Sequence, residues 1–176
     1  MMARLDRLVA RIEAGLGALL VAAILVLLLA NVVSRGIGRP LIWTDELAVH
    51  LMAWLAFLGA SLGIAGRNHM AIGILPDRLD PRARATLRVV VTLLVVAFLA
   101  VMLMLCWLWL DPAGLIRAGS GAALAAETFN FVYTDPTQTL GIRKIWFWLI
   151  VPTSMTAAML HALTALRADL AVLRAT

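Results

Sequence analysis

Four long apolar runs alternate with short polar segments along the chain. They are Ala14–Val33, Leu47–Ala65, Val89–Leu110 and Ile145–Leu166. A helix needs about 20 mostly apolar residues to cross the hydrocarbon core of a membrane, and each run is about that long. The pattern therefore predicts an all-α integral membrane protein, with a single membrane domain over residues 1–176. Its four transmembrane helices are predicted at approximately 14–34, 44–66, 84–110 and 144–166.

The polar segments between the runs predict where the helices begin and end. Apolar residues recur at helical spacing in the first sixteen residues, which predicts an amphipathic segment that lies in the membrane interface and then turns into the first span. Asp80 and Pro81 form an N-cap followed by proline at the first helical position. Asp111 and Pro112 end the third helix, and a connection over 111–142 follows. Within this connection "GAALAAETFNF" predicts a short surface helix and "TDPTQ" a turn.

Composition supports a membrane protein and excludes a nucleic-acid-binding one. The chain is 63% hydrophobic and 14% charged, with a mean hydropathy of +0.97, whereas about a quarter of the residues in a soluble domain are charged. The formal net charge is +5, but the basic residues are scattered between apolar runs rather than gathered on one polar face. The single cysteine, Cys106, lies within an apolar run, so the chain has no internal disulfide.

The basic residues also predict the orientation in the membrane. Positive charge is enriched on the cytoplasmic side of membrane proteins. If the chain crosses four times, ten basic residues fall on the side of the termini and five on the other, the five being Arg35, Arg39, Arg117, Arg143 and Lys144. Both termini are therefore predicted to be cytoplasmic, and the 111–142 connection periplasmic. Five tryptophans, Trp43, Trp107, Trp109, Trp146 and Trp148, then lie at the outer interface, which tryptophan prefers.

Two adjacent carboxylates stand at the start of the second span. Thr44 is a candidate N-cap, and Asp45 and Glu46 then occupy the first helical turn, where negative charge stabilises the helix dipole by about 0.3–1 kcal/mol. We interpret Asp45 in this way. Glu46 has a second interpretation, because His50 lies one turn further along and is within reach of its carboxylate. Capping and contact with another subunit therefore both stay open for Glu46.

The sequence gives no support for a proton relay or a haem site. The first, third and fourth apolar runs contain no Asp, Glu, Lys or Arg, and a relay needs such groups inside the membrane. His50 and His161 differ in predicted height by roughly 16 Å, too far for the two axial ligands of one haem. His161 is therefore interpreted as a polar residue near the interface, and His69 as a loop residue. No cofactor, metal site or catalytic residue is predicted.

The second span also carries small residues at a spacing that suits helix packing. Gly59 and Gly63 form a GxxxG pattern, which lets another helix approach closely. Asn31 and Ser34, near the end of the first span, are interpreted as polar residues that join helices.

The stretch "WTDELAVHLMAWLAFLGASLGIAGRNHMAIGIL" resembles the central signature of the small membrane subunit (Q-type, DctQ-like) of tripartite ATP-independent periplasmic (TRAP) transporters. In that family a tryptophan and an acidic pair open the second helix, and a further tryptophan, an "FLG" step and an inner histidine follow. "TQTLGIRKIWFWLIVP" is similar to the family's entry into the fourth helix. The 111–136 part of the outer connection is longer than is usual in the family, and Arg143 replaces a frequent proline. Together with the spacing of His50 and Gly63 described above, the resemblance gives these partner-interface candidates: Trp43, Asp45, Glu46, His50, Trp54, Gly59, Gly63 and His69.

The resemblance implies a function that composition alone does not give. It implies a non-enzymatic, multi-pass subunit of the bacterial inner membrane, surrounded by lipid. Its partners would be a large TRAP membrane subunit, which moves like an elevator, and a periplasmic substrate-binding protein. The chain would brace the large subunit in sodium-coupled transport of organic acids. The alternative is a membrane anchor subunit of a redox or other enzyme complex, for which paired histidines at equal depth are missing. An autonomous small exporter would need a carboxylate within the membrane, which is also missing.

Overall fold

The protein is a bundle of long helices with two short helices at one end. A computed structural model describes residues 2–66 and 79–175. Over these residues it contains α1 (Met2–Gly36), α2 (Trp43–Ala65), α3 (Pro81–Leu110), α4 (Pro112–Ala118), α5 (Gly121–Thr128), α6 (Ile145–Trp148) and α7 (Ile150–Ala175). Four helical segments of the described chain are long and apolar enough to cross a membrane. The prediction of an all-α membrane protein with four spanning helices is confirmed.

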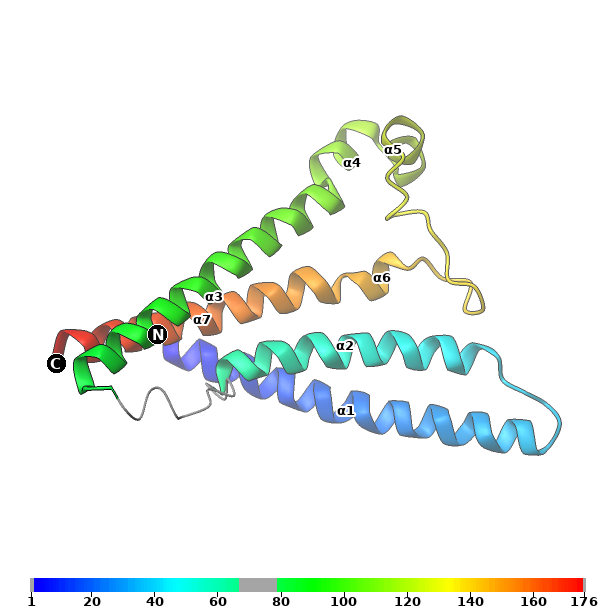
Figure 1. The fold of residues 1–176 in the computed structure, drawn as a ribbon. Helices are drawn as coiled ribbons and strands as arrows, with labels where there is room; N and C mark the ends of the chain where they lie inside the picture. The colour runs from blue at the N-terminus through cyan, green and yellow to red at the C-terminus, as the bar shows by residue number, and fades with distance from the viewer. Residues whose placement is uncertain (1, 67–78, 176) are drawn as a thin grey trace.

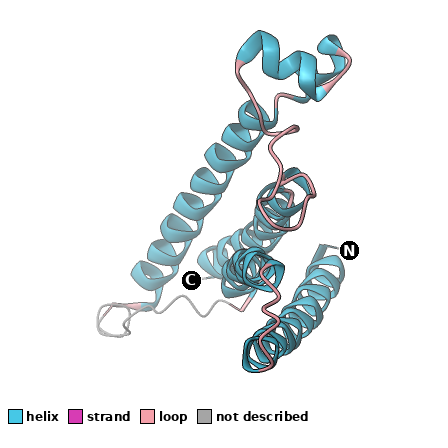
Figure 2. Cartoon of the chain, turned by 90° about the vertical axis from the view of Figure 1, so that its right-hand side faces the viewer, coloured by secondary structure: helices cyan, strands magenta, loops and turns pink. Residues whose placement is uncertain are grey.

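The long helices are arranged as a hairpin, a central helix and a tilted fourth helix. α1 and α2 lie antiparallel, α7 packs against α2, and α3 packs mainly against α7 (Figure 1). The N- and C-termini lie at the same end of the bundle, which we call the inner end. Viewed along the bundle, α3 leans away from the other three long helices, and α4 and α5 stand at its far end (Figure 2). That the inner end faces the cytoplasm remains a prediction from charge.

The apolar centre of the bundle is small. Leu99 of α3 and Ala158 and Ala162 of α7 are buried there, and partly buried residues surround them, namely Ile64, Val95, Val96, Met155 and Met159. The alanines allow α3 and α7 to approach closely. In contrast, only 11% of the most apolar part of α1 and 28% of that of the α6–α7 segment are buried within the chain. Most of the apolar surface therefore faces outward, and lipid or another protein must cover it.

α1 is one continuous helix, which corrects the expected turn between the amphipathic segment and the first span. It comprises 35 residues, or about 52 Å at 1.5 Å per residue, more than the thickness of the hydrocarbon core. The physical reason is that polar residues of its first half, Asp6 and Glu13, bind a histidine of α7. These contacts hold the segment beside the bundle as an extension of the first span.

α3 has the ends that its sequence predicts. Asp80 accepts a hydrogen bond from the N–H of Ala83 (3.3 Å), and Pro81 is the first helical residue. At the other end Asp111 adopts a left-handed conformation (φ 40°), and its N–H bonds to the carbonyl of Trp107. The chain then re-enters a helix at Pro112. α5 corresponds to the predicted surface helix, whereas α4 was not predicted.

The fourth span is interrupted near its outer end. α6 ends at Trp148, and α7 begins at Ile150. Pro152 explains the break, because proline has no N–H to donate to the carbonyl four residues earlier, that of Trp148, and its ring collides with that carbonyl. The four-residue helix α6 is therefore set apart from the rest of the span, and it contributes residues to the site described below.

The common end of the termini generates a test of membrane orientation. In a Cys106→Ala background we expect Gln138→Cys, in the exposed outer connection, to react with a membrane-impermeant maleimide on intact spheroplasts. Ala3→Cys, exposed at the inner end, should react only after the membrane is permeabilised. The reverse pattern would show that the charge asymmetry has been assigned to the wrong side.

Candidate functional site

The outer ends of α1 and α2 are joined by an outer polar cluster that is centred on Asn31. The Asn31 side chain is buried, and its Nδ2 donates to Thr44 Oγ1 (2.9 Å) and to Asp45 Oδ1. Its Oδ1 accepts from Arg35 Nε (2.5 Å). Ser34 donates to the carbonyl of Asn31 (2.8 Å) and accepts from the N–H of Leu41 (3.2 Å). Asn31 therefore joins α1 to α2, as predicted, whereas Ser34 binds the connection between these helices.

Thr44 is not the N-cap of α2, which corrects our prediction. The helix begins at Trp43, and the preceding Ile42 is in a right-handed helical conformation without a side-chain cap. The Thr44 hydroxyl instead donates to the carbonyl of Leu41 (2.5 Å) and accepts from Asn31. Its side chain is only 1% exposed, because it faces α1 across the hairpin. The contact between the helices has replaced the capping role.

Asp45 lies in the first turn of α2, where a negative charge suits the helix dipole. It also pairs with Arg35 at the end of α1, with 2.8 Å between Nη2 and Oδ2. Both side chains of the pair are more than half exposed, and such surface pairs contribute little, at most about 1 kcal/mol. The dipole interpretation of Asp45 is thus incomplete, but its expected small energetic weight is unchanged.

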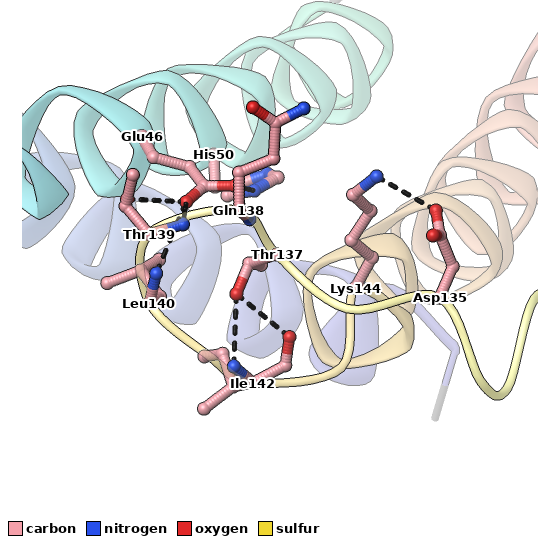
Figure 3. Close-up of polar contacts among 9 residues, drawn as sticks. All are labelled: Glu46, His50, Asp135, Thr137, Gln138, Thr139, Leu140, Ile142 and Lys144. Carbon is pink, nitrogen blue, oxygen red and sulfur yellow. Dashed lines mark hydrogen bonds and ion pairs between the residues drawn. The ribbon is translucent and has the colours of Figure 1, made fainter.

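Glu46 binds a loop that is more than ninety residues away in the sequence. Its Oε1 accepts from the N–H of Gln138 (2.8 Å), and its Oε2 accepts from the N–H groups of Thr139 (2.6 Å) and Leu140 (3.3 Å). The Thr139 hydroxyl also donates to Oε2 (2.6 Å). Figure 3 shows the carboxylate facing this run of N–H groups. Neither interpretation that we left open for Glu46 included this contact.

The bound segment is the tip of a small, self-supported loop, Asp135–Lys144. The N–H and hydroxyl of Thr137 both donate to the carbonyl of Ile142, and the Ile142 N–H donates back to the hydroxyl. At the base, Lys144 donates from its N–H to the Asp135 carbonyl (2.9 Å) and from Nζ to the Asp135 carboxylate (2.8 Å). Figure 3 shows both sets of contacts. Glu46 therefore fastens a preformed loop to α2 rather than folding it.

Two further candidates on α2 contact α6. The His50 ring stacks on that of Phe147, with centroids 4.0 Å apart and planes 6° from parallel. Its Nε2 is 4.0 Å from Glu46 Oε1, too far for a hydrogen bond. Trp54 Nε1 donates to the Phe147 carbonyl (2.8 Å). These contacts fix α6 on α2, whereas Trp43, at the start of α2, is 41% exposed and faces outward.

The two glycines of the GxxxG pattern face no other helix of the described part of the chain. A Cβ built on Gly59 or Gly63 would meet nothing within 4 Å among the described residues. Gly17 of α1 differs, since a Cβ there would contact Leu55 of α2 at 3.8 Å. The GxxxG pattern is therefore left free by the bundle. His69 lies outside the described residues.

The inner end of the bundle contains an inner ion cluster of Asp6, Glu13 and His161. His161 of α7 is 2% exposed, and its ring lies between two carboxylates of α1. Nδ1 is 2.7 Å from Asp6 Oδ1, and Nε2 is 3.0 Å from Glu13 Oε2. Ionised carboxylates only accept hydrogen bonds, so the two contacts together require two protons, both on the ring or one on the ring and one on a carboxyl group.

This cluster corrects two interpretations from the sequence. His161 is fully buried between helices rather than exposed at the interface, and ionisable groups are buried in the bundle after all. Asp169 of α7 is a further example, since it is 5% exposed and accepts from Thr92 of α3 (2.9 Å). The sequence held one signal for the cluster: Asp6 and Glu13 are seven residues apart and so share one helix face. Nothing in the sequence linked that face to His161.

These residues connect helices and show no arrangement for chemical catalysis. Among the described residues, no group of three or more His, Cys, Asp and Glu side chains has a geometry that would hold a metal ion. The polar side chains instead fasten α1 to α2, α2 to the 135–144 loop, α1 to α7 and α7 to α3. Between the two ends the buried side chains of the described residues are mostly apolar, with Ser61 and Ser154 as exceptions. The arrangement can fix the relative positions of helices and leave apolar faces open.

Comparison with known proteins gives a family match over most of the chain. Residues 24–172 match the family model described as "Tripartite ATP-independent periplasmic transporters, DctQ component". The chain is 30% identical over 93 residues to a "Putative TRAP transporter small permease protein" of Haemophilus influenzae (strain ATCC 51907 / DSM 11121 / KW20 / Rd), covering 52% of this chain and 53% of that protein. It is 34% identical over 86 residues to the "Sialic acid TRAP transporter permease protein SiaT" of Haemophilus influenzae (strain 86-028NP), covering 48% of this chain and 14% of that protein.

The contacts of Glu46 predict a local effect of its removal. In Glu46→Ala the N–H groups of residues 138–140 lose their acceptor, so we expect their hydrogen exchange to become several-fold faster, while exchange within α2 stays unchanged. Exchange mass spectrometry of the full chain in nanodiscs measures this. Asp45→Asn is the matched control, because the Asp45 carboxylate lies next to Glu46 in the sequence but does not bind the loop. Equal exchange at 138–140 in Glu46→Ala and wild type would mean that the loop does not depend on Glu46.

The inner ion cluster predicts a large loss of stability on removal of its histidine. His161→Phe leaves the Glu13 carboxylate buried without a partner, and breaking a buried pair in this way costs about 3–5 kcal/mol. Denaturant unfolding of the detergent-solubilised chain, followed by circular dichroism, measures the loss. The double variant Glu13→Leu/His161→Leu should regain a large part of it, because apolar side chains need no ionic partner. A single variant as stable as wild type would rule out this cluster as a fastener.

Proposed function

The chain belongs to the DctQ family of tripartite ATP-independent periplasmic transporter components, and on this premise we propose that it braces the large membrane subunit of a sodium-coupled organic acid transporter. It is a transporter subunit rather than an enzyme, and a multi-pass protein of the bacterial inner membrane. The chain spans 53% and 14% of the lengths of the two relatives above, so the transport activity, substrate and partners belong to the proposal.

The bracing role is supported by how polarity is distributed. Polar side chains hold the helices together at both ends, whereas the only buried polar side chains of the described residues between these contacts are two serines, Ser61 and Ser154, with no buried carboxylate or basic group. A pathway for an anion and its coupling ion would need several converging polar or ionisable groups at that depth. The substrate and sodium sites are therefore assigned to the large subunit, and this chain supplies a rigid surface against which that subunit moves.

The face through which the chain contacts the large subunit is proposed to be the open side of α2. Gly59 is exposed, Gly63 is half-buried, and a Cβ on either would have none of the described residues within 4 Å. In membranes, close approach at small residues is a main source of helix association, because lipid provides no hydrophobic force between helices. The outer candidates on the same helix then act indirectly: Asp45 pairs with α1, Glu46 holds the outer connection, and His50 holds α6 in place beside that face.

The substrate is proposed to be an organic anion of the carboxylate or sialic acid type, delivered by a periplasmic binding protein. The printed name of one relative, a sialic acid permease, supports this class. The similarity to that relative covers only part of this chain, so it supports a class of substrate and not one compound.

Reconstitution tests the proposal. Proteoliposomes with the chain, the large subunit and the binding protein should take up a labelled carboxylate from a panel when a sodium gradient is imposed, and omission of either membrane subunit should abolish uptake. Gly63→Leu should lower both uptake and co-purification with the large subunit several-fold, because a leucine blocks close approach. Gly15→Leu is the matched control, since Gly15 also has open space around it but lies on α1.

Uptake and co-purification with the large subunit test the bracing role and the contact face separately. Sodium-driven uptake by the chain without the large subunit would overturn the bracing role. Full uptake by the large subunit without this chain would do the same. Equal effects of Gly63→Leu and Gly15→Leu would overturn only the assignment of the contact face to α2.

A further inference from the structure

The segment that follows α3 exposes large apolar side chains although it does not span the membrane. We call this segment the outer helical hairpin: α4, α5 and residues 129–134. Ile116 and Phe129 are each 81% exposed, and Phe131 is 54% exposed. Phe129 adopts a left-handed conformation (φ 58°), which is unusual for an aromatic residue and ends α5. Exposure of this kind marks a surface that is covered in the working protein.

The direction of the hairpin is fixed by the turn that begins it. The Asp111 carboxylate accepts from the N–H of Gly114 (2.9 Å) and lies against the glycine. A Cβ on Gly114 would be 2.0 Å from Asp111 Oδ2, so a larger residue does not fit there without displacing the carboxylate. The hairpin therefore leaves α3 at a defined angle rather than as a loose loop.

The hairpin also provides hydrogen-bond donors for the last backbone carbonyls of α3. The last carbonyls of a helix receive no hydrogen bond from an N–H group of the same helix, and they normally accept from water or from capping groups instead. Here Asn130 Nδ2 donates to the carbonyl of Trp109 (2.8 Å), and the Tyr133 hydroxyl donates to that of Leu110 (2.6 Å). Burial, with the charge of Asp111 nearby, raises the pKa of the Tyr133 phenol, so it stays a donor. Carbonyls that are satisfied internally suit a site with little water.

The exposed phenylalanines border an open apolar groove. It has a volume of about 410 Å³ and is lined by Ala122, Ala125, Ala126, Phe129, Phe131 and Thr134. Five of the six lining residues are alanine or phenylalanine, which suits an apolar occupant. The lining offers one hydroxyl and no charge, which fits a hydrocarbon chain better than a polar peptide.

The position of the hairpin indicates that its occupant is lipid. α4 and α5 stand beside the bundle, level with α6, whereas the α1–α2 hairpin extends further outward (Figure 1). The outward face of α3 is apolar up to its end, with Phe98 and Leu108 58% and 63% exposed, and Ile116 of α4 continues this apolar surface. A segment that is displaced sideways at this height, beside the lipid-facing surface of a spanning helix, meets the membrane interface.

We propose that the outer helical hairpin is a membrane-interface anchor, in which Ile116, Phe129 and Phe131 insert among the phospholipid acyl chains of the leaflet opposite the termini and the groove takes up one chain. The anchor holds the tilted end of α3 at a fixed depth. At this end α3 makes an edge-to-face contact with α6 through Trp109 and Trp148. The proposal does not depend on the transported substrate.

Depth-dependent quenching tests this anchor in the full chain in nanodiscs of phosphatidylethanolamine and phosphatidylglycerol. In a Cys106→Ala background, Phe129→Cys and, separately, Ile116→Cys are labelled with a bimane fluorophore. The control is Arg39→Cys, exposed in the connection between α1 and α2. We expect lipids with a nitroxide near the glycerol end of the acyl chain to quench labels at 129 and 116 several-fold more than the label at 39. A water-soluble quencher should show the opposite order.

The remaining outcomes contradict the proposal. Labels at 116 and 129 that are quenched by the aqueous agent as strongly as the label at 39 would show that the hairpin stands in water. Labels that become protected from both quenchers only when the large subunit is added would show that a protein covers this surface. Two labelled positions in different helices guard against a local disturbance by either substitution, and unchanged helicity shows that each variant is folded.

Discussion

Helix α7 holds the bundle together because it carries polar groups that must be paired away from water. His161 reaches two carboxylates of α1, and Asp169 accepts from Thr92 of α3. A lone charge in such a place would be costly, so the contacts can be broken only at a large energetic loss. α1 and α3 are therefore both tied to α7 at the inner end, and the position of each long helix follows from these ties and from the small apolar centre of Leu99, Ala158 and Ala162.

The outer end uses a different kind of polar contact. Asn31 joins α1 to α2 through side chains, and Glu46 joins α2 to the 135–144 loop through successive backbone N–H groups. Lipid offers no hydrophobic force that would draw two apolar helices together, so hydrogen bonds and close packing must supply the specificity of their association. The outer contacts lie at the ends of α1 and α2, where interfacial water lessens the cost of any imperfect pairing, and the small apolar cluster between the two ends is built from leucine and alanine.

A bundle that is fastened at its ends and apolar over its faces has the properties of a scaffold. α1 and α3 expose most of their apolar side chains, and α2 exposes small ones. The same chain thus offers broad lipid-facing surfaces and one face that suits the backbone of another helix. The outer helical hairpin adds a third kind of surface, aromatic and displaced sideways from the bundle. This division of surfaces is consistent with a subunit that positions a partner within the membrane and performs no chemistry itself.

The sequence by itself determined the class of fold, the number of spanning helices and the ends of α3, because these depend on local quantities: the length of apolar runs, and Asp80–Pro81 and Asp111–Pro112 as helix boundaries. It also identified Asn31 as a residue that joins helices. It failed for Thr44, Glu46 and His161, whose partners lie on other elements of the fold. A pairing such as Glu46 with residues 138–140, or His161 with Asp6, is decided only when helices distant in the chain are brought side by side, since no periodicity within one helix encodes the identity of its neighbour.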